Sequence, residues 1–143
     1  MTGAVSGAVR TLLRLEGLCV LTAAVFAYSK FGIGWGVFAV FFLAPDLSFL
    51  GYLGGRRVGA IAYNAAHSYL GAVACLGLAA MLPAVMSPAV GLIWCAHIGF
   101  DRALGYGLKY AQGFGYTHLG LIGHAAKDAS KPAGEQRPAA ATV

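Results

Sequence analysis

The sequence predicts an all-α protein built as a bundle of four transmembrane helices, and two observations support that prediction. First, 59% of the 143 residues are hydrophobic and only 10% are charged, whereas a soluble domain is typically about a quarter charged. Second, the apolar residues form long stretches, and about 20 of them suffice to cross the hydrocarbon core of a bilayer. The composition excludes a soluble globular domain, and it excludes disorder outside the C-terminus.

The four predicted spans cover about residues 11–29, 31–53, 58–82 and 88–108. An alternative for the first is a cleaved signal peptide, but Glu16 lies where the apolar part of such a peptide should begin, which favours a retained helix. The glycine- and tyrosine-rich segment that follows the fourth span is expected to form an interfacial loop or a short half-helix. Residues 1–124 thus form one transmembrane domain, and residues 125–143 are expected to be a disordered cytoplasmic tail.

The positions of the basic residues predict the orientation. The first arginines of the chain, the Arg56-Arg57 turn and the tail share one side of a four-span protein, and the opposite side offers only Lys30. Because positively charged loops stay in the cytoplasm, both termini are expected there. We therefore attribute the net charge of +5 to basic residues that set the orientation of the protein in the membrane. No basic run alternates with aromatic residues, so nucleic-acid binding is not expected.

Ionisable side chains from all four spans fall at one depth. With a rise of 1.5 Å per residue, Glu16, Asp46, His67, His97 and Asp101 lie roughly 9–16 Å from the cytoplasmic ends of their helices. Each such group costs at least about 2.5 kcal/mol in hydrocarbon, so their alignment indicates a shared purpose. His97 and Asp101 are also one helical turn apart, on one face. We therefore expect a polar pocket that opens toward the cytoplasm.

The residue types in this pocket favour a divalent metal ion. Imidazole and carboxylate ligands suit zinc, iron or manganese, and helical bundles supply such ligands from facing helices. The predicted ligands are Asp46, His67, His97 and Asp101. A bound metal makes water a nucleophile near neutral pH, so hydrolysis is the expected reaction. Asn64 or Glu16 would then be the catalytic proton acceptor or would orient a ligand.

Three further polar residues each have two interpretations. Arg102 and Lys109 either reach toward lipid phosphates or bind an anionic group of a substrate. His118, in the glycine- and tyrosine-rich segment, either lies at the membrane interface or folds back as an additional ligand.

Other functions stay open at this point. The same residues can form a purely structural network that fixes helix packing or a homo-oligomer interface, without a metal. His67 and His97 lie at one depth on successive spans, which also suits bis-histidine haem ligation, although aspartates are poor neighbours for an apolar macrocycle. Ion passage is disfavoured because the far halves of the third and fourth spans carry almost no polar residue.

Several motifs resemble those of a family of small bacterial integral membrane proteins of unknown function. They are Ala44–Ser48, Tyr63–Tyr69, Ala96–Tyr110 and Thr117–Gly120. The resemblance covers roughly Leu13 to Gly123 and implies a multi-pass protein of a bacterial inner membrane.

A weaker similarity links the chain to inner-membrane proteins of the metal-dependent hydrolase type. It consists of Pro-Asp at a helix end, His-Ser on the next helix and His-x-x-x-Asp on another. This similarity implies the same four ligands, and the chain departs from it in two places. Ser48 stands where the other family has a second acidic residue, and the basic residue and extra histidine that usually precede His-Ser are absent, with Asn64 in that region. The leading hypothesis is a metal site facing the cytoplasm that hydrolyses a lipid-like ester, with the bilayer as its partner.

Overall fold

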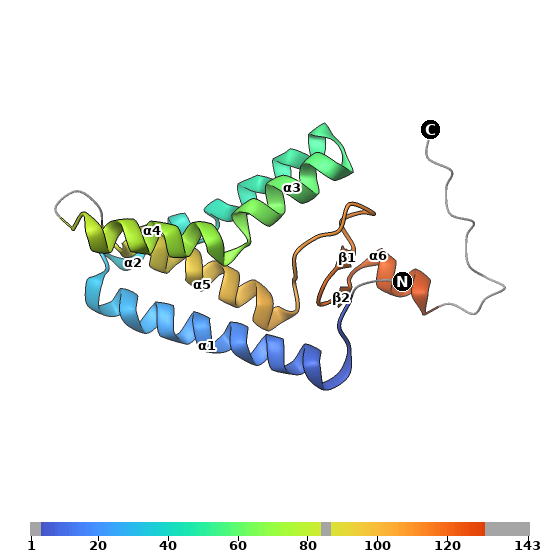
Figure 1. The fold of residues 1–143 in the computed structure, drawn as a ribbon, viewed down its shortest axis with the longest axis horizontal. Helices are drawn as coiled ribbons and strands as arrows, with labels where there is room; N and C mark the ends of the chain where they lie inside the picture. The colour runs from blue at the N-terminus through green and yellow to red at the C-terminus, as the bar shows by residue number, and fades with distance from the viewer. Residues whose placement is uncertain (1–3, 84–86, 131–143) are drawn as a thin grey trace.

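The computed structural model describes residues 4–83 and 87–130, and this part of the chain is mostly helical (Figure 1). The elements are α1 (Gly7–Phe31), α2 (Trp35–Phe42), the 3₁₀ helix η1 (Ala44–Gly54), α3 (Arg56–Ala66), α4 (Tyr69–Met81), α5 (Ala89–Leu104), the strands β1 (Tyr116–Thr117) and β2 (Gly120–Leu121), and α6 (His124–Ala129). The prediction of a helical architecture is thereby confirmed.

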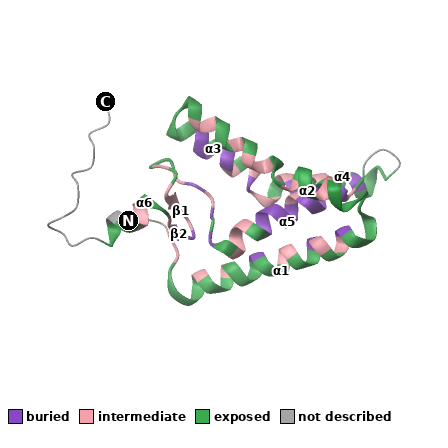
Figure 2. Cartoon of the chain, turned by 180° about the vertical axis from the view of Figure 1, so that it is seen from behind, coloured by how far each residue is buried: buried purple, intermediate pink, exposed green. Residues whose placement is uncertain are grey.

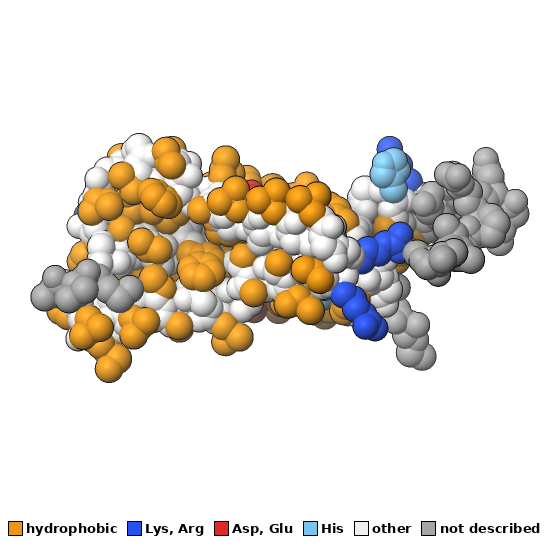
Figure 3. Space-filling model, turned by 90° about the horizontal axis from the view of Figure 1, so that it is seen from above, with side chains coloured by type: hydrophobic (Ala, Val, Ile, Leu, Met, Phe, Trp, Pro, Cys, Tyr) orange, Lys and Arg blue, Asp and Glu red, His pale blue; other side chains and the backbone are white. Residues whose placement is uncertain are grey.

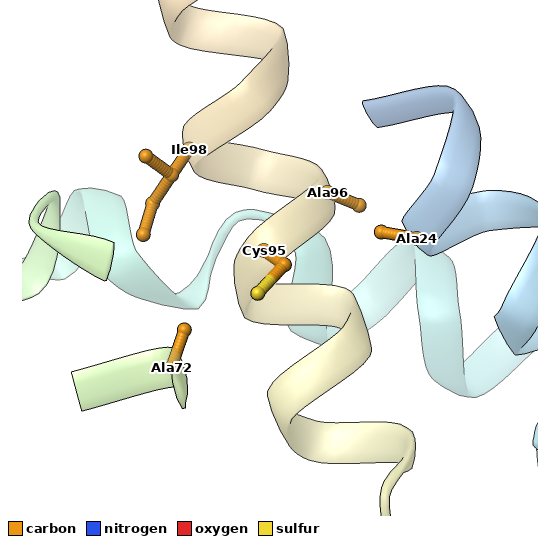
Figure 4. Packing of buried hydrophobic residues seen from close by; sticks show 5 residues of the cluster. All are labelled: Ala24, Ala72, Cys95, Ala96 and Ile98. Atoms are coloured by element: carbon orange, nitrogen blue, oxygen red, sulfur yellow. The ribbon is translucent and has the colours of Figure 1, made fainter. Parts of the chain in front are cut away.

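Helix α5 is the centre of the packing, with α1 along one side and α2 and α4 along the others (Figures 1 and 2). Small residues allow α1 to approach α5 closely, because a Cβ atom at Gly99 would lie 2.7 Å from the carbonyl oxygen of Gly17. One turn earlier in α5, Ala96 faces Ala24 of α1 (Figure 4). Such stripes of small residues are typical of helix pairs in membranes.

The second and third predicted spans are each broken into two helices, where continuous helices were expected. The second consists of α2 and η1, and the third consists of α3 and α4. Pro45 lacks a backbone N–H and so disfavours continuation of α2, while Ser68 caps α4 by accepting a hydrogen bond from the backbone N–H of Leu70. Both breaks therefore fall beside predicted ligands, at Asp46 and His67.

The surface of the described residues is largely apolar, with Lys and Arg gathered at one end (Figure 3). Among those residues, length and composition single out two segments as able to cross a bilayer, Gly7–Phe31 and Trp35–Gly54. This result weakly supports membrane association or a signal sequence. The third and fourth predicted crossings, in α3–α4 and α5, do not meet the same criterion.

The C-terminal segment differs from the expected loop or half-helix. Strands β1 and β2 form a short antiparallel hairpin, and the backbone N–H of Val5 donates to the carbonyl oxygen of His118, which ties the N-terminus to it. The predicted tail begins with helix α6. The remainder of that tail, residues 131–143, lies outside the described residues.

Candidate metal centre

Three helical segments bring the four predicted ligands together. Asp46 lies in the first turn of η1, and His67 is the C-cap residue directly after α3. His97 and Asp101 lie one turn apart on α5. The breaks in the second and third spans occur at Asp46 and His67. The position of each of these two ligands is therefore set by the end of a helix and not by the periodicity of a continuous one.

The ligand atoms converge closely. The two Nε2 atoms of His67 and His97 are 3.1 Å apart. Oδ1 of Asp46 lies 3.5 Å from the first of these nitrogens and 3.6 Å from the second. Oδ2 of Asp101 lies 3.5 and 4.0 Å from the same two atoms. One atom from each of the four residues thus lies within 4.8 Å of all the others.

These separations suit a small divalent cation. A tetrahedral site with metal–ligand distances of 2.0–2.1 Å has ligand–ligand edges of about 3.3 Å. The nitrogen–nitrogen and nitrogen–oxygen separations here run from 3.1 to 4.0 Å. Two imidazoles and two carboxylates also form a donor set suited to zinc, iron or manganese. The donor set and the spacing therefore both fit a metal ion.

The hydrogen bonding inside the cluster points the same way. Nδ1 of His67 lies 3.0 Å from the carbonyl oxygen of Tyr63, and because a carbonyl only accepts, this nitrogen carries the proton. In the neutral ring the lone pair is then on Nε2, the atom that faces both carboxylates. Ionised carboxylates also only accept. Nε2 of His97 can supply at most one proton to the three acceptors around it, which are Nε2 of His67 and the carboxylate oxygens of Asp46 and Asp101. A cation would satisfy all of these acceptors at once, so it is the simplest partner for the cluster.

Tyr63 is a part of the centre that the sequence analysis missed. Its ring stacks on the ring of His67, with centroids 3.7 Å apart and planes 11° apart. Its Oη donates to Oδ2 of Asp101 at 3.1 Å. Tyr63 therefore orients one imidazole and one carboxylate, the role that groups around a metal's ligands commonly play. The spacing of four residues between Tyr63 and His67 is a signal that could have found it.

An apolar cavity of about 470 Å³ lies beside the centre. Pro45 and Ala66, the residues directly before two of the ligands, line it. The other lining residues are apolar except Ser48, whose Oγ is buried and has no partner among the described residues. The side chain of Asp46 is 34% exposed, against 15% for Asp101. The centre is therefore most accessible on the side of Asp46.

The carboxamide of Asn64 is engaged away from the four ligands. Its Nδ2 donates to the carbonyl oxygen of Lys109, and its Oδ1 accepts from the backbone N–H of the same residue. The buried ammonium of Lys109 lies against the rings of Phe114, Tyr63 and Tyr106, with Nζ 4.0, 5.0 and 6.0 Å from the centroids. Burial lowers the pKa of Lys109 to about 8, although the negative charge of Asp101 opposes this effect.

The remaining predicted site residues lie outside the ligand cluster. Glu16 is exposed on α1 and is not one of the four converging residues. Nδ1 of His118 accepts from the backbone N–H of Leu108 at 2.8 Å, and its Nε2 lies 3.2 Å from Nη1 of Arg102. Burial and the adjacent guanidinium lower the pKa of His118. Both ring nitrogens of His118 thus face neighbours outside the ligand cluster. The catalytic roles of Asn64 and Glu16 stay predictions.

Haem ligation does not fit this geometry. Axial histidines approach the iron from opposite faces of a planar macrocycle. Here the two Nε2 atoms are 3.1 Å apart, and a carboxylate oxygen lies 3.5–3.6 Å from both. No space is left between the imidazoles for a porphyrin.

Comparison with known proteins yields a family without an assigned function. Residues 10–122 match the family described as a domain of unknown function, DUF4260. No curated protein and no solved structure matches the chain. The match confirms the resemblance to a family of unknown function, and it carries no information on a membrane or on hydrolase chemistry.

Proposed function

The chain belongs to the DUF4260 family, and we propose that it is an integral membrane protein with a divalent metal centre that hydrolyses a lipid-like ester. The observation that carries the proposal is the convergence of four acceptor atoms, from Asp46, His67, His97 and Asp101, within 4.8 Å of one another. Three helical segments separated along the chain contribute them, so the cluster is a product of the fold.

Membrane insertion is supported by the surface and by the packing. Large apolar side chains are exposed on α1, α2 and η1, including Leu47, Leu50 and Leu53, which are 64–87% exposed. In water these side chains would form a large contiguous apolar patch. The packing of α1 along α5 through Gly17 and Gly99 favours a retained first helix over a removed leader. We assign four crossings of a bacterial inner membrane, with both termini in the cytoplasm.

Each residue of the centre has a defined task in this proposal. Nε2 of His67, Nε2 of His97 and one carboxylate oxygen of each aspartate would hold the ion. The backbone carbonyl oxygen of Tyr63 fixes the tautomer of His67, and the hydroxyl of Tyr63 orients the carboxylate of Asp101. When bound, a divalent ion supplies Lewis acidity, which polarises an ester carbonyl or phosphoryl oxygen and acidifies water. Asp46 is the more exposed carboxylate, so it borders the approach of substrate and water.

The substrate class follows from the neighbouring cavity. Its apolar lining suits an acyl chain, and its volume of about 470 Å³ lies within the usual range for small-molecule sites. Ser48 provides a hydroxyl in that lining without a partner among the described residues. We assign this hydroxyl to a hydrogen bond with the ester group, because a few placed polar groups orient ligands in otherwise apolar sites.

Metal analysis of the purified full chain tests the centre. Mass spectrometry is expected to find about one zinc, iron or manganese ion per chain in the wild type and almost none in His97→Ala or Asp101→Asn. His124→Ala, which removes an exposed histidine of α6, is the matched control and should retain the ion. A chelator should lower the melting temperature of the wild type and leave that of His97→Ala unchanged. A wild type that binds no ion after incubation with each metal would end the proposal.

Hydrolysis is tested with fluorogenic esters of increasing acyl length. We expect turnover that requires the metal, that increases with chain length, and that falls in Ser48→Ala without loss of the ion. Filling the cavity with Val90→Trp should reduce turnover of long esters more than of short ones. If the protein binds the metal but hydrolyses no ester, the proposed metal centre is supported and the proposed activity is wrong.

A specific observation supports one alternative, a non-catalytic polar network that fixes helix packing. If His67 is an imidazolium, its Nε2–H can donate to either carboxylate at 3.5 Å, and no ion is needed. This alternative predicts a metal-free protein and only small losses of stability in His67→Gln.

A further inference from the structure

The side chain of Arg10, in the first turn of α1, rests against two glycines of the C-terminal segment. A Cβ atom at Gly120 would lie 3.2 Å from its Cζ, and a Cβ atom at Gly105 would lie 3.5 Å from its Nη2. The φ angles of these glycines are 128° and 96°, values that other residues rarely adopt. The backbone therefore forms a cradle that only glycine permits, and the guanidinium group occupies it.

One nitrogen of this guanidinium group lacks an acceptor within the described part of the chain. Its Nε is buried without a hydrogen-bond partner there. The ion pairs between described residues all belong to the metal centre, so no described carboxylate neutralises Arg10. An arginine keeps its charge and its five N–H donors at any physiological pH. Buried donors are normally satisfied, so this Nε–H favours an acceptor from outside the described residues.

A second guanidinium group borders the same cradle. Arg14 lies one helical turn after Arg10, and a Cβ atom at Gly105 would lie 3.9 Å from its Nε. This Nε donates to the carbonyl oxygen of Ala103 at 2.8 Å, near the C-terminal end of α5. That hydrogen bond uses one of the three guanidinium nitrogens of Arg14. Two like charges thus meet at one glycine, an arrangement that an anion would stabilise.

We propose that Arg10 and Arg14, on the cradle formed by Gly105 and Gly120, bind a phosphate group, supplied by an anionic phospholipid headgroup or by free phosphate. Guanidinium groups bind phosphate oxygens through paired, charge-assisted hydrogen bonds. The start of α1 and the β1–β2 hairpin lie at the same end of the molecule (Figure 1), which is the end where Lys and Arg gather (Figure 3). The proposed topology places that end among the cytoplasmic headgroups, where anionic lipids attract basic residues. If these arginines only set the orientation of the protein in the membrane, positive charge alone would suffice. That role does not account for a guanidinium group that packs against two glycines.

Thermal unfolding of the detergent-purified full chain tests this site, with tryptophan fluorescence as the signal. The probes are short-chain phosphatidylglycerol, short-chain phosphatidylcholine and inorganic phosphate, at matched ionic strength. We expect phosphatidylglycerol or phosphate to stabilise the wild type and phosphatidylcholine not to do so. Arg10→Gln/Arg14→Gln should weaken the apparent affinity by about tenfold or more, as expected for the loss of charged hydrogen bonds. Stabilisation by phosphatidylglycerol alone identifies a lipid site, whereas equal competition by inorganic phosphate identifies a free-phosphate site.

The matched control is Arg56→Gln/Arg57→Gln, which removes the same charge from the exposed start of α3, assigned to the same side of the membrane. This control should bind phosphatidylglycerol or phosphate within about twofold of the wild type. Arg10→Lys keeps the charge and loses the paired geometry, so it should bind more weakly even if the double variant fails to fold. An equal loss in the control, or a wild type that is indifferent to both phosphatidylglycerol and phosphate, would overturn the proposal.

Discussion

The side-chain amide of Asn64 binds the backbone of Lys109 through both of its polar groups, with hydrogen bonds of 2.9 and 2.7 Å. These two bonds connect α3 to the segment that follows α5, across 45 residues of sequence. The amide thereby acts like a strand partner for a loop that has little regular structure of its own. It also fixes the C-terminal segment beside the aromatic ring of Tyr63.

Asn64→Ala should therefore reduce stability while the metal centre stays intact. The change leaves the backbone N–H and carbonyl of buried Lys109 without these partners, at an expected cost of about 1–3 kcal/mol. Denaturant unfolding measures the loss, and metal content measures the centre. Thr22→Ala, which removes an exposed bond to the carbonyl of Leu18 within α1, is the control and should change stability little. A loss of metal in Asn64→Ala, at unchanged stability, would instead place the amide in the centre.

Tyr63→Phe separates the two roles of the tyrosine. The ring can still stack on His67, so the fold should be retained, but Asp101 loses the hydrogen bond from the hydroxyl. Loss of such an orienting partner typically lowers metal affinity by about 10- to 100-fold. Competition with a chromogenic chelator measures this affinity. Tyr106→Phe keeps its ring beside Lys109 and should bind metal like the wild type.

Sequence reasoning could reach the ligands because their positions follow from helical geometry. His97 and Asp101 share a face at a spacing of four residues, and the common depth of Asp46 and His67 follows from counting residues. Their convergence, however, depends on how the helices pack around α5, which the periodicity of single helices does not specify. Tyr63 was missed because an aromatic residue in an apolar stretch usually contacts lipid or the core.

The broken helices and the C-terminal hairpin were harder to predict for different reasons. Pro45 marked the first break, but residues 60–70, which include His67, contain no proline or glycine that would indicate the second. Strands of two residues are too short to produce an alternating pattern. The four-span prediction relied on composition, and the structure singles out two such segments among the described residues.

The buried ammonium of Lys109 predicts a specific pH dependence of stability. Its pKa is lowered from 10.5 to about 8 in the folded chain, so between these values the unfolded chain holds a proton that the folded chain has lost. Stability should therefore rise with pH across that window, and below about pH 8 the buried charge should be unfavourable. Lys109→Met should be more stable than the wild type at pH 7, and this advantage should shrink as the pH approaches 10.5.

Denaturant unfolding at a series of pH values measures that advantage. Lys127→Met, on the exposed face of α6, should show no comparable change with pH. An advantage of Lys109→Met that is constant from pH 7 to pH 10.5 would mean that folding does not lower the pKa of Lys109.

The proposed topology makes a prediction about two positions at opposite ends of the molecule. Figure 1 places the end of α1, which carries Lys30, far from the start of α3, which carries Arg57. If the basic end is cytoplasmic, a cysteine replacing Lys30 should react with a membrane-impermeant maleimide in intact cells, and one replacing Arg57 should react only after lysis. The three native cysteines are replaced by alanine beforehand. Labelling of both positions in intact cells would contradict the topology. A mature chain that begins after Ala27, where Val25-Phe26-Ala27 resembles a signal-peptidase site, would identify the first helix as a cleaved leader.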